Sequence, residues 1–364
     1  MSGNDTTAFS GDNGSTQATT FLENGWLLAA TVEFCVQCVM IATGLAGTAA
    51  NAVVLYALIL HNSRETKKRV INWLVINQNL LDLCCGAIFI IILSLRVSNI
   101  CLTGAFGYVL CAILLSGNAT YCLVNASVVN LMTLTIERYM KVFFPFWSKK
   151  NLKSWMIQAT LVFSWIAGII SMCPLGFVTS IVVDGTCLGY FLYFQTPEIK
   201  SGYGAWNFLS FFLLPLVIFV YCYGQIVFVM RKQMRVMASH NLEASAQSTS
   251  QAQSKRVKWN IIKTMIIVSA FFIICWCPFN VYVMAVENMF GPSETVGYII
   301  TLFLPYVNVS VNPFIYATKH EGVRRILARM IMCHKHDGVA AVSGTAGTSG
   351  NTAGSGTRKT QTTV

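Results

Sequence analysis

The sequence predicts an all-α membrane protein, a bundle of seven transmembrane helices followed by an amphipathic eighth helix. Three observations indicate this fold. The 364 residues are 55% hydrophobic and only 11% charged, whereas a soluble domain carries about 25% charged residues. Seven apolar stretches are each long enough for a membrane span of roughly 20 residues. Lysine and arginine gather in alternate connections between these stretches, as they do when a chain crosses a membrane repeatedly.

The seven spans are read as helices, because they are too long and too uniformly apolar for barrel strands and must satisfy their backbone internally. Pro215, Pro278 and Pro313 interrupt the last three spans, where each removes a backbone donor and opposes straight continuation. We place the spans at residues 31–60, 70–95, 108–136, 155–175, 203–230, 260–285 and 295–317.

The distribution of basic residues predicts the orientation of the bundle. No lysine or arginine precedes Arg64, and one side of the membrane holds only Arg96 and Lys200. The N-terminus is therefore expected outside and the C-terminus inside, in a multi-pass protein of the plasma membrane. The net charge of +11 is interpreted as a collar facing anionic lipid rather than a nucleic-acid-binding surface. This collar includes Arg64, Lys67, Lys68, Arg69, Lys149, Lys150, Lys153, Arg231, Lys232, Arg235, Lys255, Arg256, Lys258, Lys319, Arg324, Arg325 and Arg329.

The segments outside the bundle have distinct compositions. The first 25 residues lack the basic and apolar regions of a signal peptide. Residues 1–30 are expected to form an extracellular tail, glycosylated at Asn4 and Asn13. The bundle itself spans residues 31–317. Residues 318–332 are expected to form the amphipathic helix, with Val323, Ile326, Leu327, Met330 and Ile331 opposite Arg324, Arg325 and Arg329.

The C-terminal segment 333–364 is rich in glycine, serine, threonine and alanine and is predicted to be a disordered cytoplasmic tail. Cys333, at its start, is a candidate for palmitoylation, with a free thiol as the alternative. Its many hydroxyl side chains are available to kinases and then to arrestin. The final residues Thr362–Val364 fit the C-terminal ligand of a PDZ domain.

Most of the 13 cysteines lie within the predicted helices, where buried cysteine behaves as a small hydrophobe. Cys111 and Cys187 instead fall on the oxidising side of the membrane, and a disulfide between them would hold the loop before the fifth span over the bundle. Cys101 is a competing partner. The chain shows no phosphate-binding glycine loop, metal-ligand cluster or nucleophile with a paired base, so we expect a protein that is not an enzyme.

Glu137, Arg138 and Tyr139 lie at the inner end of the third span, with Lys141 close behind. Charged residues beside a membrane core are costly and usually functional. An adjacent acid and base at this position can hold a helix end closed or release a guanidinium to a partner below the membrane.

Seven helices with this motif after the third resemble the rhodopsin-like (class A) G protein-coupled receptors, over about residues 30–332. Several departures accompany the resemblance: Gln78 and Asn79 precede Asp82 where the family often has Leu-Ala, and the 27 residues from Cys111 to Arg138 are two more than is common. The motifs that carry the resemblance are Asn51 and Val54, Asn77 and Asp82, Glu137–Tyr139, Trp165 and Pro174, Pro215 and Tyr223, Phe272 with Cys275–Pro278, and Asn312–Tyr316.

The resemblance implies a switch that connects an outer ligand to an inner G protein. When the sixth helix swings outward, Tyr223 and Tyr316 are expected to join Arg138, and the opened cleft accepts a heterotrimeric G protein. The residues implied in this switch are Glu137, Arg138, Tyr139, Tyr223, Phe272, Trp276, Pro278, Asn312, Pro313 and Tyr316.

The resemblance also places Ser127, Asn308 and Asn312 near Asp82, a carboxylate in the middle of the second span. An unpaired carboxylate there is costly, so it needs a proton, a cation or hydrogen-bond donors. Oxygen ligands suit a hard cation, and the four residues resemble the family's sodium pocket. A water-filled polar network without an ion is the alternative. We expect no other cofactor.

Two ligand classes are disfavoured by single positions. The seventh span has Tyr306 and no lysine before Lys319, so a retinal Schiff base is not expected. No acid occurs between Cys111 and Glu137, which disfavours a monoamine. An extracellular peptide or a neutral small molecule is therefore predicted. The candidate ligand pocket contains Thr120, Tyr121, Trp206, Asn280 and Tyr306.

Two other functions compete with a signalling receptor. A transporter or channel is one, although the chain shows no internal repeat and an odd number of spans. A receptor-like scaffold that binds without signalling is the other, and the intact Arg138 and Tyr316 argue against it. Because Lys258 stands where some members carry an acid that pairs with the arginine, we expect measurable basal activity that Lys258→Glu would lower.

Overall fold

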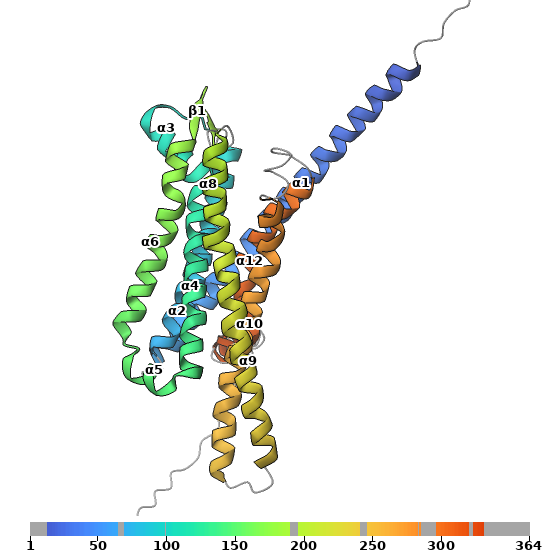
Figure 1. The fold of residues 1–364 in the computed structure, drawn as a ribbon. Coiled ribbons are helices and arrows are strands. Elements are labelled where there is room, and N and C mark those ends of the chain that lie inside the picture. The colour runs from blue at the N-terminus through green and yellow to red at the C-terminus, as the bar shows by residue number, and fades with distance from the viewer. Residues whose placement is uncertain are drawn as a thin grey trace, which may run out of the picture.

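A computed structural model of the chain describes residues 13–64, 69–98, 100–189, 196–240, 246–282, 284, 296–319 and 323–330. The predicted cytoplasmic tail, Cys333, residues 362–364 and Asn4 lie outside these residues. The helices stand side by side as an elongated bundle, with α1 projecting beyond it at its N-terminal end (Figure 1). In chain order the long helices are α1 (Asn13–Arg64), α2 (Arg69–Val97), α4 (Asn118–Phe143), α6 (Ser154–Thr179), α9 (Leu214–His240), α10 (Ala246–Val281) and α12 (Val296–Lys319).

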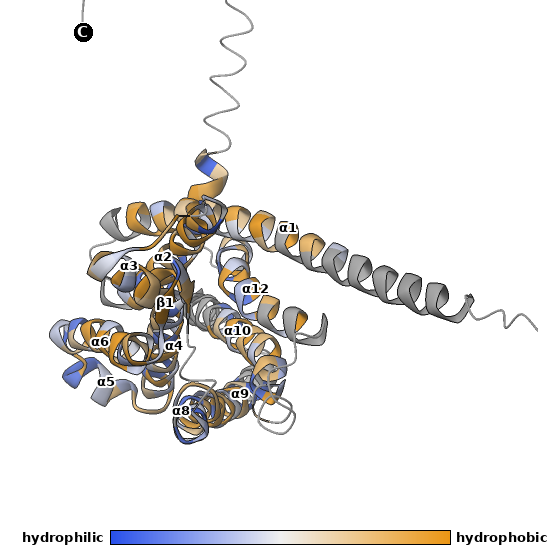
Figure 2. Ribbon diagram, turned by 90° about the horizontal axis from the view of Figure 1, so that it is seen from above, coloured by the Kyte–Doolittle hydropathy of each residue, from blue (hydrophilic) through white to orange (hydrophobic). Residues whose placement is uncertain are grey.

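Six helices within the described ranges are long and apolar enough to cross a membrane. The 24-residue α12 is the seventh long helix, and two prolines lie inside it. Large apolar side chains such as Val220, Ile170 and Phe228 point away from the bundle and are more than 60% exposed. Seen from above, hydrophobic colour covers outward faces of the helices (Figure 2). This is the surface of a multi-pass membrane protein, because lipid covers the apolar exterior.

The first helix is longer than the sequence predicted. It begins at Asn13 rather than at residue 31, so the segment expected to form a tail is largely helical. The segment contains no proline, the residue that most strongly ends a helix, and it runs directly into the apolar span. Asn13 is the first helical residue, and its side chain lies outside the described set.

The third span is not the single helix predicted over residues 108–136. It consists of α3 (Gly104–Leu110), the π-helical turn η1 (Cys111–Leu115) and α4, separated by a break at Gly117. Gly117 has φ +78°, a left-handed conformation that glycine adopts without steric cost. The wide π turn and this break accommodate the two extra residues between Cys111 and Arg138, because a π turn holds more residues per turn than an α-helix.

The fifth span has a similar interruption. The helix α8 (Pro197–Phe208) passes through the π turn η2 (Leu209–Leu213) into α9. Pro215 is the second residue of α9, so its missing N–H falls just after the wide turn. Proline disrupts the preceding turn of an α-helix, and the π turn accommodates this disruption.

A β-hairpin lies at the end of the bundle opposite the Arg138 end. Strands β1 (Ile181–Val183) and β2 (Thr186–Leu188) pair in antiparallel register through a turn of two residues. Asp184 and Gly185 both have positive φ, 50° and 75°, which is the conformation of a tight hairpin turn. The Leu102 amide donates to the Gly185 carbonyl at 2.9 Å and holds the hairpin tip against the preceding loop.

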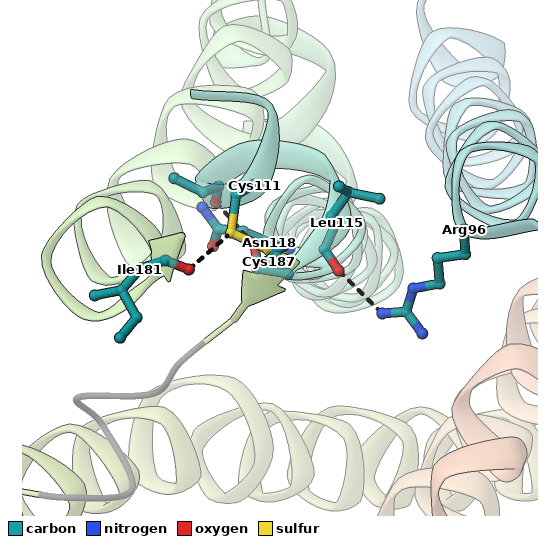
Figure 3. Close-up of a disulfide and its surroundings, with 8 residues drawn as sticks. Arg96, Cys111, Leu115, Asn118, Ile181 and Cys187 are labelled. Atoms are coloured by element: carbon teal, nitrogen blue, oxygen red, sulfur yellow. Dashed lines mark hydrogen bonds between the residues drawn. A yellow bond between two sulfur atoms is a disulfide. The ribbon is translucent and has the colours of Figure 1, made fainter. Parts of the chain in front are cut away.

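A disulfide joins this hairpin to the third span. Cys111 in η1 and Cys187 in β2 form the bond, with their Cα atoms 5.3 Å apart, as predicted (Figure 3). Cys101, the competing partner, is a free and exposed thiol. The Arg96 guanidinium donates to the Leu115 carbonyl at 2.9 Å on the other side of η1. The π turn is thus fixed from both sides.

The bundle packs around α4, which contacts α2, α6 and α9 and is largely buried. By contrast, α10 packs mainly on α12 and has few contacts with α4 and α9. After α12, residues 323–330 form a short helix with Val323 and Ile326 buried and Arg324 and Arg329 exposed. The amphipathic eighth helix is therefore present at the predicted position. Met330, expected on its apolar face, is 37% exposed because it lies at the end of the described turn.

Candidate functional site

The first group of functional residues surrounds Asp82, in the middle of α2. Asn312 on α12 donates to Asp82 Oδ2 at 2.8 Å, and Ser127 on α4 donates to Oδ1 at 3.4 Å. Asn308, one turn before Asn312, lines the same cavity. The structure thus brings all three residues that were expected near this carboxylate, Ser127, Asn308 and Asn312, to the same cavity. The cavity beside them has room for roughly one water molecule.

Gln78 belongs to this group, although sequence reasoning noted it only as a departure from the family pattern. It lies one helical turn before Asp82 and is 1% exposed. Its side-chain Nε2 contacts Ser127 Oγ closely and lies 3.4 Å from Asp82 Oδ1. The spacing of four residues on a helix was the signal that could have identified it, since residues four apart face the same way.

The second group is a stack of aromatic rings between the Asp82 cavity and the outer half of α10. The rings of Phe272 and Trp276 lie 6.0 Å apart and nearly parallel, and Phe219 on α9 meets Phe272 edge to face at 5.7 Å. Phe272 and Trp276 also line the Asp82 cavity. Pro278 follows within α10. The stack connects the proline-weakened part of α10 to the polar centre.

The third group lies at the C-terminal end of α4, the end expected to be inside. The Arg138 Nε lies 3.4 Å from Glu137 Oε2, and Lys141 forms a second ion pair with Glu137. Glu137 and Arg138 are both at least 90% buried. Neither Glu137 oxygen nor the Arg138 Nε makes a well-aligned hydrogen bond among the described residues. The carboxylate is therefore shared between two cations, both on its own helix.

The two switch tyrosines lie near this end of the bundle. Tyr223 on α9 is buried, and its hydroxyl lies 3.0 Å from that of Thr135, one turn before Arg138. Tyr316 on α12 is fully buried, and its hydroxyl has no hydrogen-bond partner within the described part of the chain. A buried hydroxyl without a partner is costly, so Tyr316 is poised to gain one. Tyr139 stacks on Phe143 at 4.5 Å and faces Tyr221 rather than the interior.

The candidate ligand-pocket residues lie on four helices and differ in exposure and in their contacts. Trp206 is 56% exposed on α8, and Asn280 donates to the Trp276 carbonyl of its own helix at 2.9 Å. The Tyr306 ring lies 4.6 Å from that of Phe89 in a tilted arrangement, and it lines a second cavity between α1, α2 and α12. Thr120 is buried on α4, and Tyr121 beside it is half-buried. Residue type alone could not predict how far each of these side chains is exposed, and a pocket role for Trp206 stays a prediction.

Sequence reasoning missed one exposed residue near the Arg138 end. Phe146, in the short helix α5 (Pro145–Asn151) that follows α4, is 90% exposed. Phe144 and Trp147 beside it are also exposed, and a contiguous exposed apolar patch marks contact with a partner or with lipid. The position of Phe146 three residues after the end of α4, beside Pro145, was the available signal. The side chain of Lys258, which the sequence singled out, lies outside the described set.

Comparison with known proteins agrees with this geometry. The family described as 7 transmembrane receptor (rhodopsin family) matches residues 50–316. The crystal structure of squid rhodopsin has the same fold, with a TM-score of 0.66 and 19% identity, covering 83% of this chain and 85% of the other.

Curated relatives share more of the sequence. Somatostatin receptor type 4 of Rattus norvegicus is 25% identical over 81% of this chain and 72% of its own length. Trace amine-associated receptor 1 of Mus musculus is 26% identical over 72% of this chain and 78% of its own. Melanin-concentrating hormone receptor 1 of Rattus norvegicus is 23% identical over 78% and 77%. With its seven helices and the matched residues 50–316, the chain belongs to the rhodopsin family of seven-transmembrane receptors.

Proposed function

We propose that this receptor resides in the plasma membrane and transmits the binding of an extracellular ligand to a heterotrimeric G protein by outward movement of α10. The observation that carries the proposal is the arrangement at the inner end of α4. Arg138 is buried beside a carboxylate that also pairs with Lys141. The distribution of basic residues supports a cytoplasmic position for this end and an extracellular position for the hairpin.

The movement of α10 follows from its packing. Pro278 removes one backbone hydrogen bond inside the helix and weakens it there. Below that point the helix packs mainly on α12 and little on α4. Its aromatic rings at Phe272 and Trp276 fill the space next to the Asp82 cavity. A ligand that displaces Trp276 therefore shifts a helix that has a weak point and few contacts with α4 and α9 to lose.

The inner end is built to change partners when α10 moves. The buried hydroxyl of Tyr316 gains a partner if Arg138 turns from Glu137 toward the opened cleft. Tyr223, already beside Thr135, lies on the helix next to that cleft. A bound G protein stabilises the open arrangement, and by linkage it also raises the affinity for the outer ligand.

The proposed ligand is a peptide or a neutral small molecule. The described part of α4 and η1 carries no acidic side chain above Glu137, so nothing there pairs with an ammonium group. The disulfide holds the hairpin against the third span at the end proposed to be extracellular, where a ligand would approach. Relatives named for somatostatin and for melanin-concentrating hormone are consistent with a hormone-like ligand. Kinases, arrestin and a PDZ protein remain proposed partners of the tail.

The test is a nucleotide-exchange assay in membranes that contain the full chain and a panel of heterotrimeric G proteins. Peptides, neutral small molecules and amines are added in turn. We expect a peptide or neutral compound to raise exchange, and Arg138→Ala to reduce the stimulated rate at least tenfold, which corresponds to about 1.4 kcal/mol. Arg138→Lys, which keeps the charge without the planar fork, serves as the matched variant and should retain part of the rate.

Two results would contradict the proposal. If an Arg138→Ala receptor reached the cell surface and activated G proteins normally, Arg138 at the inner end would not be needed for signalling. Ligand-dependent solute uptake without nucleotide exchange would instead support a transporter.

A further inference from the structure

A continuous chain of buried polar side chains crosses the bundle from α6 to Asp82. The Trp165 indole Nε1 donates to Asn77 Oδ1 at 2.9 Å, and Asn77 Nδ2 donates to Asn130 Oδ1 at 3.0 Å. Asn130 Nδ2 then donates to Gln78 Oε1 at 2.8 Å. The three amide side chains are all more than 90% buried. In such an environment each hydrogen bond strengthens the next, and an unpaired member would be costly.

The two ends of this chain fix the direction of every hydrogen bond in it. An indole N–H can only donate, so the oxygen of Asn77 must face Trp165. Each following amide must then accept on its oxygen and donate from its nitrogen. The last donor is the NH₂ group of Gln78, which faces the carboxylate of Asp82. A carboxylate only accepts, and the chain closes there without conflict.

The NH₂ group of Gln78 therefore occupies the side of Asp82 where a cation would have to bind. A cation needs lone pairs from Asp82 Oδ1 and Ser127 Oγ, and both of these atoms face the Gln78 nitrogen. Asn312 also presents an N–H to the other carboxylate oxygen. Three donors already surround the carboxylate, so this arrangement does not fit a sodium ion and favours a polar network without one.

We propose that the side-chain amide of Gln78 is a tethered replacement for a sodium ion, and that it makes the receptor insensitive to sodium. A bound cation stabilises the state that holds it in proportion to its concentration. A side chain does so at every ion concentration. The chain of amides from Trp165 keeps the NH₂ group pointed at Asp82, so its orientation does not depend on the ligand or the G protein.

The test measures thermal unfolding of the purified full-length receptor in NaCl, KCl and choline chloride at equal ionic strength. We expect the same unfolding midpoint in all three salts. Gln78→Leu removes the amide and opens the site, so its midpoint should rise with NaCl relative to the other salts and level off as the site fills. Asp82→Asn in the Gln78→Leu background should abolish that rise.

A measurement on the unsubstituted receptor alone can overturn the proposal. A sodium-specific rise in its midpoint, lost on Asp82→Asn, would show that a cation binds despite Gln78. This measurement stays decisive if Gln78→Leu fails to fold, and Gln78→Met then offers a longer apolar replacement. A folded Gln78→Leu receptor whose thermal unfolding midpoint does not change with sodium would also contradict the proposal. None of these outcomes depends on G protein activation, so they are separate from the test of the proposed function.

Discussion

The Asp82 centre and the Arg138 end both hold buried charges, but their partners lie on different elements. Asp82 on α2 accepts hydrogen bonds from Ser127 on α4 and Asn312 on α12. Among the described residues, Glu137 pairs with Arg138 and Lys141 alone, and both lie on its own helix. The centre therefore ties three helices together, whereas the ion pairs at the inner end tie none to α10 among the described residues. The centre can hold the bundle while the inner end opens.

The largest effect on stability is expected in the centre. Trp165→Phe removes the only donor at the start of the amide chain and leaves Asn77 Oδ1 buried without its partner. Such a loss costs about 1–3 kcal/mol. The thermal unfolding midpoint of the purified receptor should fall. Trp155→Phe, at a residue that is 63% exposed on the same helix, is the control and should change the midpoint little.

Tyr316→Phe is the corresponding substitution at the inner end, and unlike Trp165→Phe it should not lower the stability. Tyr316→Phe removes a buried hydroxyl that has no partner among the described residues. The midpoint should stay the same or rise, because an unpaired buried group is removed, while ligand-stimulated nucleotide exchange falls. The lost interaction in the open state is worth about 0.5–1.5 kcal/mol. A lower midpoint with normal signalling would show that Tyr316 supports the resting fold instead.

The smallest effect concerns the second cation at Glu137. Of the two cations paired with Glu137, Lys141→Met leaves only Arg138. The Glu137–Arg138 ion pair should then be stronger and stabilise the resting state. A partly exposed pair contributes about 0.2–1 kcal/mol, so basal nucleotide exchange should drop by up to roughly fivefold. Lys149→Met on α5 is the control for a lost surface charge. An increase in basal exchange would mean that Lys141 restrains the receptor rather than loosening it.

Much of the architecture behind this comparison could be predicted from the sequence. Apolar runs and basic connections located the helices, because the membrane imposes length and charge rules on any spanning chain. The cysteine pair followed from its place along those helices, whereas the cluster around Asp82 was expected only from the resemblance to the receptor family. The break at Gly117 and the two π turns could not be foreseen, since apolar periodicity does not distinguish a π turn from an α turn.

Other features escaped sequence reasoning because they depend on which way a side chain faces. Trp206 fits a pocket by residue type, yet it lies on the exposed side of α8. Gln78 differs from the expected apolar residue, but its role depends on Asn130 and Ser127, which lie on another helix. Only the packed bundle shows that a donor-only indole and a carboxylate stand at the two ends of one chain.

The most direct test of the contrast between a fixed centre and an opening end is a distance measurement across the inner cleft. Spin labels are attached through cysteines at Asn260 on α10 and Lys150 on α5, both exposed, in a receptor whose accessible free cysteines are replaced by serine. Pulsed electron resonance then gives the distance with and without a nucleotide-free G protein. We predict a longer distance when the G protein is bound. An unchanged distance in a complex shown to contain the G protein would contradict the account.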